Sequence, residues 1–392
     1  MSASLPIEVE GRGQLLGMSP ADFLRDYWQQ RPLLIRGALP GFESPLSPND
    51  LAGLAMESDA LSRLIRWEPR RDRWHLENGP IAAERYASLP KRHWTLLVQD
   101  VDKWDPEVRA LLGHFDFLPA WRLDDIMISY AVPGGSVGAH IDQYDVFLLQ
   151  GLGTRRWQID ARPQVEPALR DDAPIKLLQR FKATHEWLLQ PGDMLYLPPA
   201  IAHHGVAESE CLTLSVGMRA PSLGELLVGY ADEHARRLPD WRRYGDSGLA
   251  PSADPYEIDA AALTRVRAAL SAAAQAEDAE LAEWFGRYIT SYRSAFAARE
   301  GARLPRAADI AARFAKGQQL IADPWARRAW SARGRGAWLC IAGAALPCSR
   351  KLARAISAQG RIDAALYAAM SEDERAFVPS LIAAGAFHWG RA

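Results

Sequence analysis

GAHIDQYDVFLLQ, residues 138–150, is the stretch of this sequence that decides the fold. Its second half is apolar and predicts a buried strand. His140 and Asp142 stand two residues apart before that run, and side chains i and i+2 of a strand point to the same side. An imidazole and a carboxylate are therefore expected to project together, as two ligands of one metal ion would. Exposed strand ends also carry such pairs, so a third residue has to decide between the two interpretations.

The third residue is expected in LQPGDMLYLPPAIAHHGVAESECLTLSVG, residues 189–217. Its Pro-Gly pair suits the two central positions of a type II turn, and a double proline ends the strand that follows. His203 and His204 come next, and His203 lies 63 residues after His140, which leaves room for strands that return to the same barrel. Two histidines and one carboxylate on one face suit non-haem Fe(II), with positions left open for a cosubstrate and oxygen.

A cation accompanies these residues. TRRWQID, residues 154–160, predicts a strand in which Arg155 shares one face with the apolar Trp157 and Ile159. A cation on an inward face needs an anionic partner, and the carboxylate of a 2-oxo acid can bind a guanidinium through two hydrogen bonds. The alternative is that Arg155 and Arg156 are both exposed.

The composition is that of an ordinary globular protein, with 48% hydrophobic and 24% charged residues in a chain of 392. A net charge of −2 indicates no general attraction to polyanions, so any such contact would need a local patch. Three cysteines without a CxxC motif indicate a reducing compartment. We expect no secretory signal and no membrane span, because the apolar stretch 337–348 is short and contains a proline. These features predict a soluble, cytoplasmic protein.

The sequence pattern changes from strand-like to helical near residue 222. Short strands separated by Gly, Pro and Asp turns predict a sandwich or barrel up to that point. Ser222 and Glu225 then form a capping box that starts a helical region. Between 281 and 292, apolar and aromatic residues cover one helix face, which predicts burial in a core or against a second copy of the chain. Further helices from Ser349 and Ser371, closed by the strand-like AFHWG, resemble a winged helix.

Together these motifs resemble a known enzyme family. An HxD pair, a basic residue 15 positions later and a PPxxxH segment resemble the JmjC family of 2-oxoglutarate-dependent oxygenases. The fuller runs at 130–157, 191–199 and 215–222 are similar to those of the bacterial ribosomal oxygenases, which hydroxylate an arginine of a large-subunit ribosomal protein. The resemblance implies Fe(II), 2-oxoglutarate and oxygen as cofactors. It also implies a double-stranded β-helix, the cupin or JmjC barrel, in an α+β protein.

The resemblance also implies roles for individual residues. The metal ligands would be His140, Asp142 and His203, with His203 preferred over His204 by its spacing from the double proline. Arg155 would bind the distal carboxylate of 2-oxoglutarate, with Ser129 as a hydroxyl partner. The expected substrate contacts form a second set, Asp125, Tyr144 and Ser215, which would supply a carboxylate, an aromatic face and a hydroxyl to an arginyl side chain.

The expected organisation has three parts. Residues 1–221 form the oxygenase domain, 222–299 a helical dimerisation region, and 300–392 a winged-helix-like domain. We expect a homodimer that acts on a ribosomal protein. The short charge run Arg350, Lys351 and Arg354 indicates a solvated helix face and does not favour nucleic-acid binding. Three alternatives stay open: the same chemistry on another protein residue, as in histidyl hydroxylation or N-methyl demethylation; a metal-binding cupin without oxygenase activity; and a winged-helix regulator.

Overall fold

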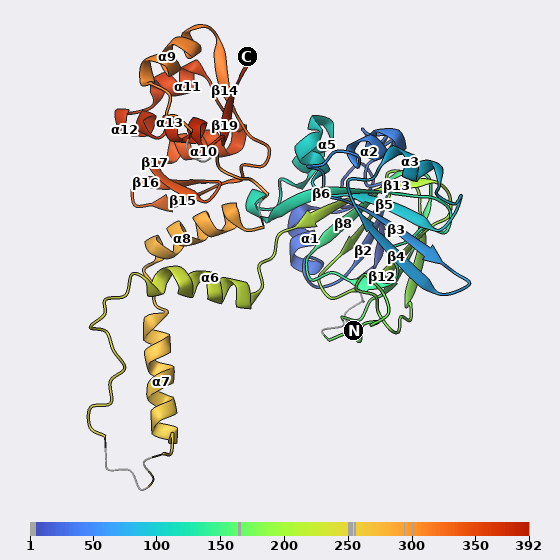
Figure 1. Ribbon diagram of the computed structural model, residues 1–392, viewed down its shortest axis with the longest axis horizontal. Coiled ribbons are helices and arrows are strands. Elements are labelled where there is room, and N and C mark those ends of the chain that lie inside the picture. The colour runs from blue at the N-terminus through green and yellow to red at the C-terminus, as the bar shows by residue number, and fades with distance from the viewer. Residues whose placement is uncertain are drawn as a thin grey trace. The chain divides into compact units, whose positions relative to one another are not determined.

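The computed structural model describes residues 5–163, 166–249, 254, 256–293, 295–299 and 302–391. The chain divides into two compact units, residues 1–220 and 221–392 (Figure 1). Within the described ranges, no helix combines the length and the apolar character needed to cross a bilayer.

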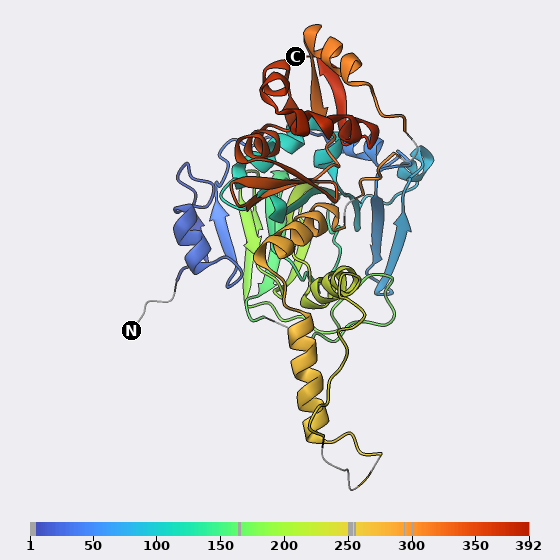
Figure 2. The ribbon, with the colours of Figure 1, turned by 90° about the vertical axis from the view of Figure 1, so that its left-hand side faces the viewer.

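The first unit is built on two β-sheets (Figures 1 and 2). The larger sheet has the order β1-β2-β11-β8-β13-β6-β5-β3-β4 among the described residues, and the smaller has the order β10-β9-β12-β7. The larger contains β1 (Glu8–Glu10), β2 (Leu33–Arg36), β3 (Ser62–Glu68), β4 (Arg73–Asn78), β5 (Trp94–Val98), β6 (Leu123–Ala131), β8 (Val146–Leu152), β11 (Met194–Leu197) and β13 (Cys211–Met218). The smaller contains β7 (His140–Ile141), β9 (Arg155–Asp160), β10 (His185–Leu189) and β12 (Ala202–Ala207). The predicted barrel architecture is therefore confirmed.

Short helices cover the outer face of the larger sheet. They are α1 (Pro20–Asp26), α2 (Pro48–Leu54), α3 (Ala83–Ala87), α4 (Val101–Trp104) and α5 (Pro106–Ala110), with 3₁₀ turns η1 (Leu111–Phe115) and η2 (Ala120–Arg122). α1 begins after Ser19, because the Ser19 hydroxyl accepts a hydrogen bond from the Asp22 amide and Pro20 takes the first helical position.

Strand β8 explains why the opening stretch is apolar without alternation. Phe147 packs on the α1 side, where its ring lies 5.7 Å from that of Phe23. Val146 and Leu148 point to the opposite face and pack with Trp157 of the smaller sheet. Both faces of β8 are therefore buried, and its inner face looks toward the strands that carry the candidate ligands.

The second unit begins with three helices, α6 (Leu223–Ala235), α7 (Ala260–Ala273) and α8 (Asp278–Ser291). The predicted capping box of Ser222 and Glu225 is present at the start of α6. On the predicted aromatic face of α8, Trp284 contacts Tyr230 of α6 at a ring distance of 5.1 Å and is buried. By contrast, α6 and α7 contain no buried residue.

The remainder of this unit mixes helices and strands. Its helices are α9 (Ala307–Ala315), α10 (Arg350–Gln359), α11 (Ala364–Ala369), α12 (Glu372–Ala376) and α13 (Val378–Ala383). One three-stranded sheet contains β18 (Arg361–Ile362), β14 (Gln318–Ala322) and β19 (Phe387–Arg391), and another contains β15 (Arg328–Arg333), β16 (Gly336–Ile341) and β17 (Ala344–Ser349). The predicted helix start at Ser349 and the closing strand β19 are confirmed.

Two features of this unit were not predicted. The β15–β16–β17 meander covers the apolar stretch 337–348, and its turns depend on Gly334 and Gly343, which adopt positive φ angles of 52° and 85°. The segment after Ser371, expected as one helix, divides into α12 and α13 because the backbone turns at Phe377 and Pro379 starts the second helix.

Candidate active site

The structure brings together the three residues of the candidate metal centre. His140 on β7 and His203 on β12 are register partners in an antiparallel pair, and their rings lie 4.2 Å apart. Asp142 follows β7 directly, and its Oδ2 lies 3.9 Å from Nε2 of His140 and 3.6 Å from Nε2 of His203. One ligand atom from each residue lies within 4.8 Å of the other two.

Backbone carbonyls orient both imidazoles. Nδ1 of His140 lies 3.0 Å from the carbonyl oxygen of Gly138, and Nδ1 of His203 lies 2.9 Å from that of Ile201. Because a carbonyl oxygen only accepts hydrogen bonds, each Nδ1 is the protonated nitrogen and each Nε2 keeps its lone pair. Burial lowers the pKa of His203 to about 4, so its ring is neutral near pH 7 and can act as a ligand. Two imidazoles that present Nε2, together with a carboxylate, fit a divalent iron site.

His204 lies outside this cluster. It pairs with Gln158 in the register between β12 and β9, so its side chain leaves the opposite face of β12 from that of His203. Its ring meets Phe181 edge-on at 6.1 Å. The geometry therefore favours His203 between the two adjacent histidines.

Arg155 is buried on the inner face of β9, only 2% exposed. Its Nη1 donates to the hydroxyls of Ser129 at 3.2 Å and Thr213 at 3.3 Å, and its Nη2 donates to the carbonyl of Gly205 at 3.5 Å. Within the described part of the chain, no carboxylate lies within ion-pair distance of this guanidinium, and its Nε has no hydrogen-bond partner. Burial lowers the pKa of Arg155, as expected for a desolvated cation without a counter-charge.

Arg156 differs sharply from Arg155. Its side chain is exposed and forms ion pairs with Glu186 at 2.7 Å and Glu208 at 2.6 Å. The alternative in which both arginines are exposed is therefore wrong. The inward position of Arg155 agrees with the face it shares with Trp157.

The ring of Trp157 is a neighbour of both Arg155 and the candidate ligand His203. The guanidinium of Arg155 lies 5.1 Å from the centroid of Trp157, and the ring of His203 lies 5.9 Å from the same indole. Gly205 is the register partner of Trp157, and a Cβ there would come within 2.8 Å of the Arg155 Nε and 2.7 Å of the indole. A Cβ at this position would therefore displace the indole or the guanidinium.

Sequence reasoning missed Thr213 and Gln150. Thr213 receives a hydrogen bond from Arg155 and donates one to Oε1 of Gln150 at 3.2 Å, and both residues are buried. A signal existed in CLTLSVG, because Thr213 and Ser215 alternate with apolar residues and so share one face of β13.

The expected substrate contacts follow the same inner face. Ser215 on β13 is buried and pairs with Met127, one step along β6 from Asp125 on that face. Asp125 Oδ2 accepts a hydrogen bond from the Asp100 amide at 3.0 Å. Burial, followed by repulsion from neighbouring aspartates, raises the pKa of Asp125 to about 7.

Tyr144 is placed by a bend, because β7 ends at Ile141 and the chain turns before β8. An expectation that Tyr144 shares a strand face with His140 and Asp142, four and two residues before it, is therefore wrong. Its side chain is 38% exposed, and the charge of Asp142 raises the pKa of its phenol.

Comparisons with known proteins agree with this geometry. Residues 110–226 match the JmjC domain family, and residues 271–388 match the ROXA-like winged helix. The chain is 38% identical over 272 residues to the ribosomal protein uL16 3-hydroxylase of Escherichia coli, a match that covers 69% of this chain and 71% of that protein. It is 40% identical over 224 residues to a probable ribosomal oxygenase of Haemophilus influenzae, covering 57% and 55%.

Solved structures extend the likeness to almost the whole chain. The structure of E. coli ycfD superposes with a TM-score of 0.83 at 31% identity, covering 96% of this chain and 99% of that one. A structure of E. coli YcfD with cobalt and 2-oxoglutarate gives 0.80 at 31% identity, covering 95% and 99%. These matches confirm the predicted fold and enzyme class. The chain belongs to the ribosomal oxygenases, JmjC-domain enzymes of the 2-oxoglutarate-dependent dioxygenase class.

Proposed function

We propose that this enzyme hydroxylates an arginyl side chain of ribosomal protein uL16. In this proposal Fe(II) is held by His140, Asp142 and His203, and 2-oxoglutarate binds with its distal carboxylate on Arg155. The single observation that carries the proposal is the buried guanidinium of Arg155 on the same face of the smaller sheet as the candidate metal ligands. Among the described residues, this guanidinium has no acidic partner. The name of the E. coli relative supports uL16 as the target.

The cosubstrate supplies what the buried cation lacks. A carboxylate at Arg155 would accept hydrogen bonds from the guanidinium, and the hydroxyls of Ser129 and Thr213 lie beside it. The other end of the same molecule carries the 2-oxo acid group, which can chelate a metal. When bound, iron with 2-oxoglutarate and oxygen supplies oxidative decarboxylation to succinate and CO₂, with one oxygen atom passing to a substrate C–H bond.

The chain itself orients the groups and keeps water away. Hydrogen bonds to backbone carbonyls hold the imidazoles of His140 and His203 in orientation without a metal, which reduces the reorganisation needed when a metal binds. Trp157 and the inner residues of β8 close the space between the sheets. A dry site of this kind strengthens the attraction between Arg155 and an anionic cosubstrate.

Asp125, Tyr144 and Ser215 are proposed to hold the arginyl substrate. A guanidinium would supply a counter-charge, which the half-buried Asp125 does not have among the described residues, and binding would therefore return the pKa of Asp125 toward its ordinary value. Tyr144 offers an aromatic surface, and stacking of a guanidinium on such a ring is favourable.

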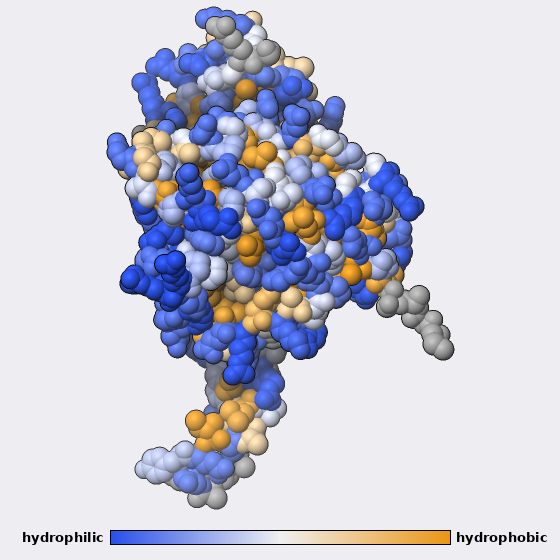
Figure 3. Space-filling view, turned by 90° about the vertical axis from the view of Figure 1, so that its right-hand side faces the viewer, coloured by the Kyte–Doolittle hydropathy of each residue, from blue (hydrophilic) through white to orange (hydrophobic). Residues whose placement is uncertain are grey.

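We also propose that the enzyme is a homodimer assembled through α6 and α7. Leu227 is 65% exposed and Leu263 is 52% exposed, and neither helix buries any residue in the single chain. Figure 3 shows hydrophobic residues at the surface of α7 and the segment before it. A second copy of the chain would remove this apolar surface from water.

The deciding experiment is mass spectrometry of uL16 from an unhydroxylated source after incubation with the enzyme, Fe(II), 2-oxoglutarate and oxygen. One added oxygen atom on a single arginine, absent with His140→Ala, is the expected result. Oxygen added to a histidine, or loss of a methyl group, would replace arginine as the target and keep the enzyme class. No product and no succinate from iron-loaded protein would contradict the proposal.

A further inference from the structure

The charge of this chain is distributed unevenly. Residues 300–392 contain 14 lysines and arginines against 7 aspartates and glutamates, a net charge of +7. Because the whole chain carries −2, the first 299 residues carry −9. Such an asymmetry is typical of chains in which one part contacts a polyanion, and the overall charge conceals it.

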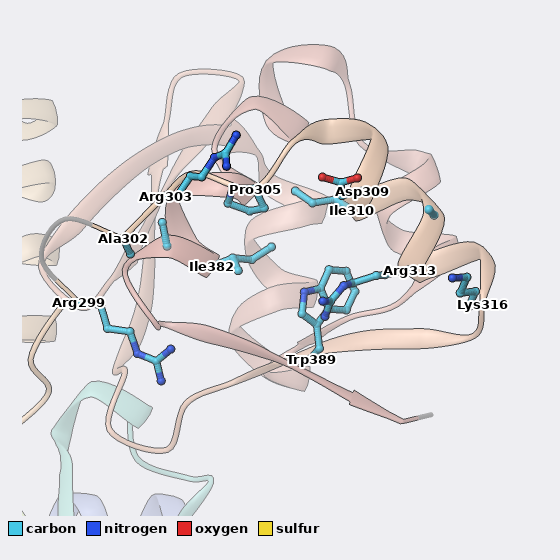
Figure 4. Close-up of a pocket in the computed structure, with 12 residues that line it drawn as sticks. Arg299, Ala302, Arg303, Pro305, Asp309, Ile310, Arg313, Lys316, Ile382 and Trp389 are labelled. Atoms are coloured by element: carbon cyan, nitrogen blue, oxygen red, sulfur yellow. The ribbon is translucent and has the colours of Figure 1, made fainter.

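A pocket of about 590 Å³ concentrates this charge. It lies between the segment before α9, α9 itself and β19 (Figure 4). Four cationic side chains line it, Arg299, Arg303, Arg313 and Lys316, and the acidic group in the lining is Asp309. Where the chain is described, none of these four cations has a carboxylate within ion-pair distance. The excess of positive charge at the pocket is therefore available to a ligand.

Two of the three cations that the sequence singled out on α10 have contacts within their own unit. The guanidinium of Arg350 donates to the carbonyls of Gly334 and Gly336. Arg354 lies over the ring of Trp330 at 5.2 Å. These two arginines therefore contact other groups of their own unit.

A guanidinium stacked on an indole forms one wall of the pocket. The guanidinium of Arg313 lies 5.2 Å from the centre of the Trp389 indole (Figure 4). Phe314 contacts that indole edge-on at a ring distance of 5.1 Å. Arg313 is exposed, so its outer face is open to a further planar group. Nucleic-acid bases stack on both guanidinium and indole planes when they are splayed out of a single strand.

We propose that this pocket binds a nucleotide of single-stranded RNA, with its base on the Arg313–Trp389 stack and its phosphates beside the unpaired arginines. The volume suits a group of that size and excludes a duplex. The choice of RNA rests on the proposed function, because the proposed substrate is a ribosomal protein and ribosomal proteins bind RNA. Binding to a single strand rests on the pocket alone.

The test is fluorescence anisotropy of a labelled oligo(A) RNA titrated with the full-length protein at low and near-physiological salt, without iron or 2-oxoglutarate. Arg303→Glu alone and together with Arg313→Glu is expected to weaken binding about tenfold or more and to reduce its salt dependence. Arg335→Glu is the matched control, because Arg335 is an exposed cation of the same unit outside the pocket lining. It should change the affinity less than about twofold.

The outcomes separate this proposal from the hydroxylase. His140→Ala should bind RNA as the wild type does, so RNA binding survives even if uL16 hydroxylation is not observed. Absence of binding at low salt would overturn the proposal. Equal weakening by Arg335→Glu would show general attraction without a site, and would overturn it as well. Displacement of the RNA by AMP at equal nucleotide concentration would reassign the pocket to a free nucleotide and refute the RNA assignment.

Discussion

Replacement of Arg155 by methionine should separate cosubstrate binding from folding. Methionine fills a similar volume without charge or hydrogen-bond donors. If Arg155 binds the distal carboxylate, its loss leaves that carboxylate buried without a partner in the complex. Without 2-oxoglutarate, the same change removes a buried cation that lacks a carboxylate partner among the described residues.

The size of both effects follows from that burial. Removing one member of a buried charge pair costs about 2–4 kcal/mol, which corresponds to a 2-oxoglutarate affinity about 30-fold to 1,000-fold weaker. Replacing a buried charge by an apolar side chain is neutral or stabilises by about 1–3 kcal/mol. The free energy of unfolding of the apo protein should therefore stay equal or rise, although its affinity for 2-oxoglutarate falls.

Calorimetric titration of 2-oxoglutarate into Fe(II)-loaded protein under nitrogen measures the affinity, and urea unfolding of the apo protein measures stability. Arg156→Met is the matched control, because that side chain is exposed and paired with Glu186 and Glu208. It should leave the affinity unchanged. A 2-oxoglutarate affinity within threefold of wild type for Arg155→Met would refute the reasoning, and so would an apo protein destabilised by several kcal/mol.

Three further predictions concern other parts of the structure. Asp125, with a pKa raised to about 7, is ionised above neutrality, so kcat/KM for the ribosomal substrate should fall about tenfold from pH 8 to pH 6, and Asp125→Asn should flatten that profile. Gly205→Ala should raise the KM for 2-oxoglutarate at least about tenfold, because its methyl group displaces the Trp157 ring; unchanged steady-state kinetics would contradict this. Leu227→Asp with Leu263→Asp should convert a dimer into monomers in sedimentation velocity, whereas a wild-type monomer would refute the proposed interface.

The sequence carried enough information for the candidate metal centre because its three residues lie on or beside short, regular strands. Alternation within TRRWQID correctly predicted that Arg155 points inward with Trp157. The direction of Tyr144 could not be predicted in the same way. The bend after Ile141 interrupts the alternation of faces, so it does not apply to the residues between β7 and β8. Pairings across strands, such as Thr213 with Ser129, depend on sheet order and could not be predicted locally.

The second unit was harder to predict for a different physical reason. Its meander contains small residues and few β-branched ones, so strand propensity is weak and the pattern resembles a buried helix. Gly334 and Gly343 supply the turns, but a glycine alone does not reveal which flanking residues pair. The pocket beside Trp389 was also hidden, because its cations come from a loop, a helix and residues beyond it.

The register between β9 and β12 sets the distance between the Arg155 guanidinium and His203, which can be compared with the length of 2-oxoglutarate. Arg155 pairs with Ala207, but its guanidinium reaches back along the strand to the carbonyl of Gly205, two residues from His203 on the same face. Two residues of a strand span about 7 Å, which is comparable to the length of a five-carbon dicarboxylate. Gly205 makes that reach feasible, because any side chain there would occupy the path of the guanidinium. The long arginine and the missing side chain opposite Trp157 are thus complementary parts of one binding site.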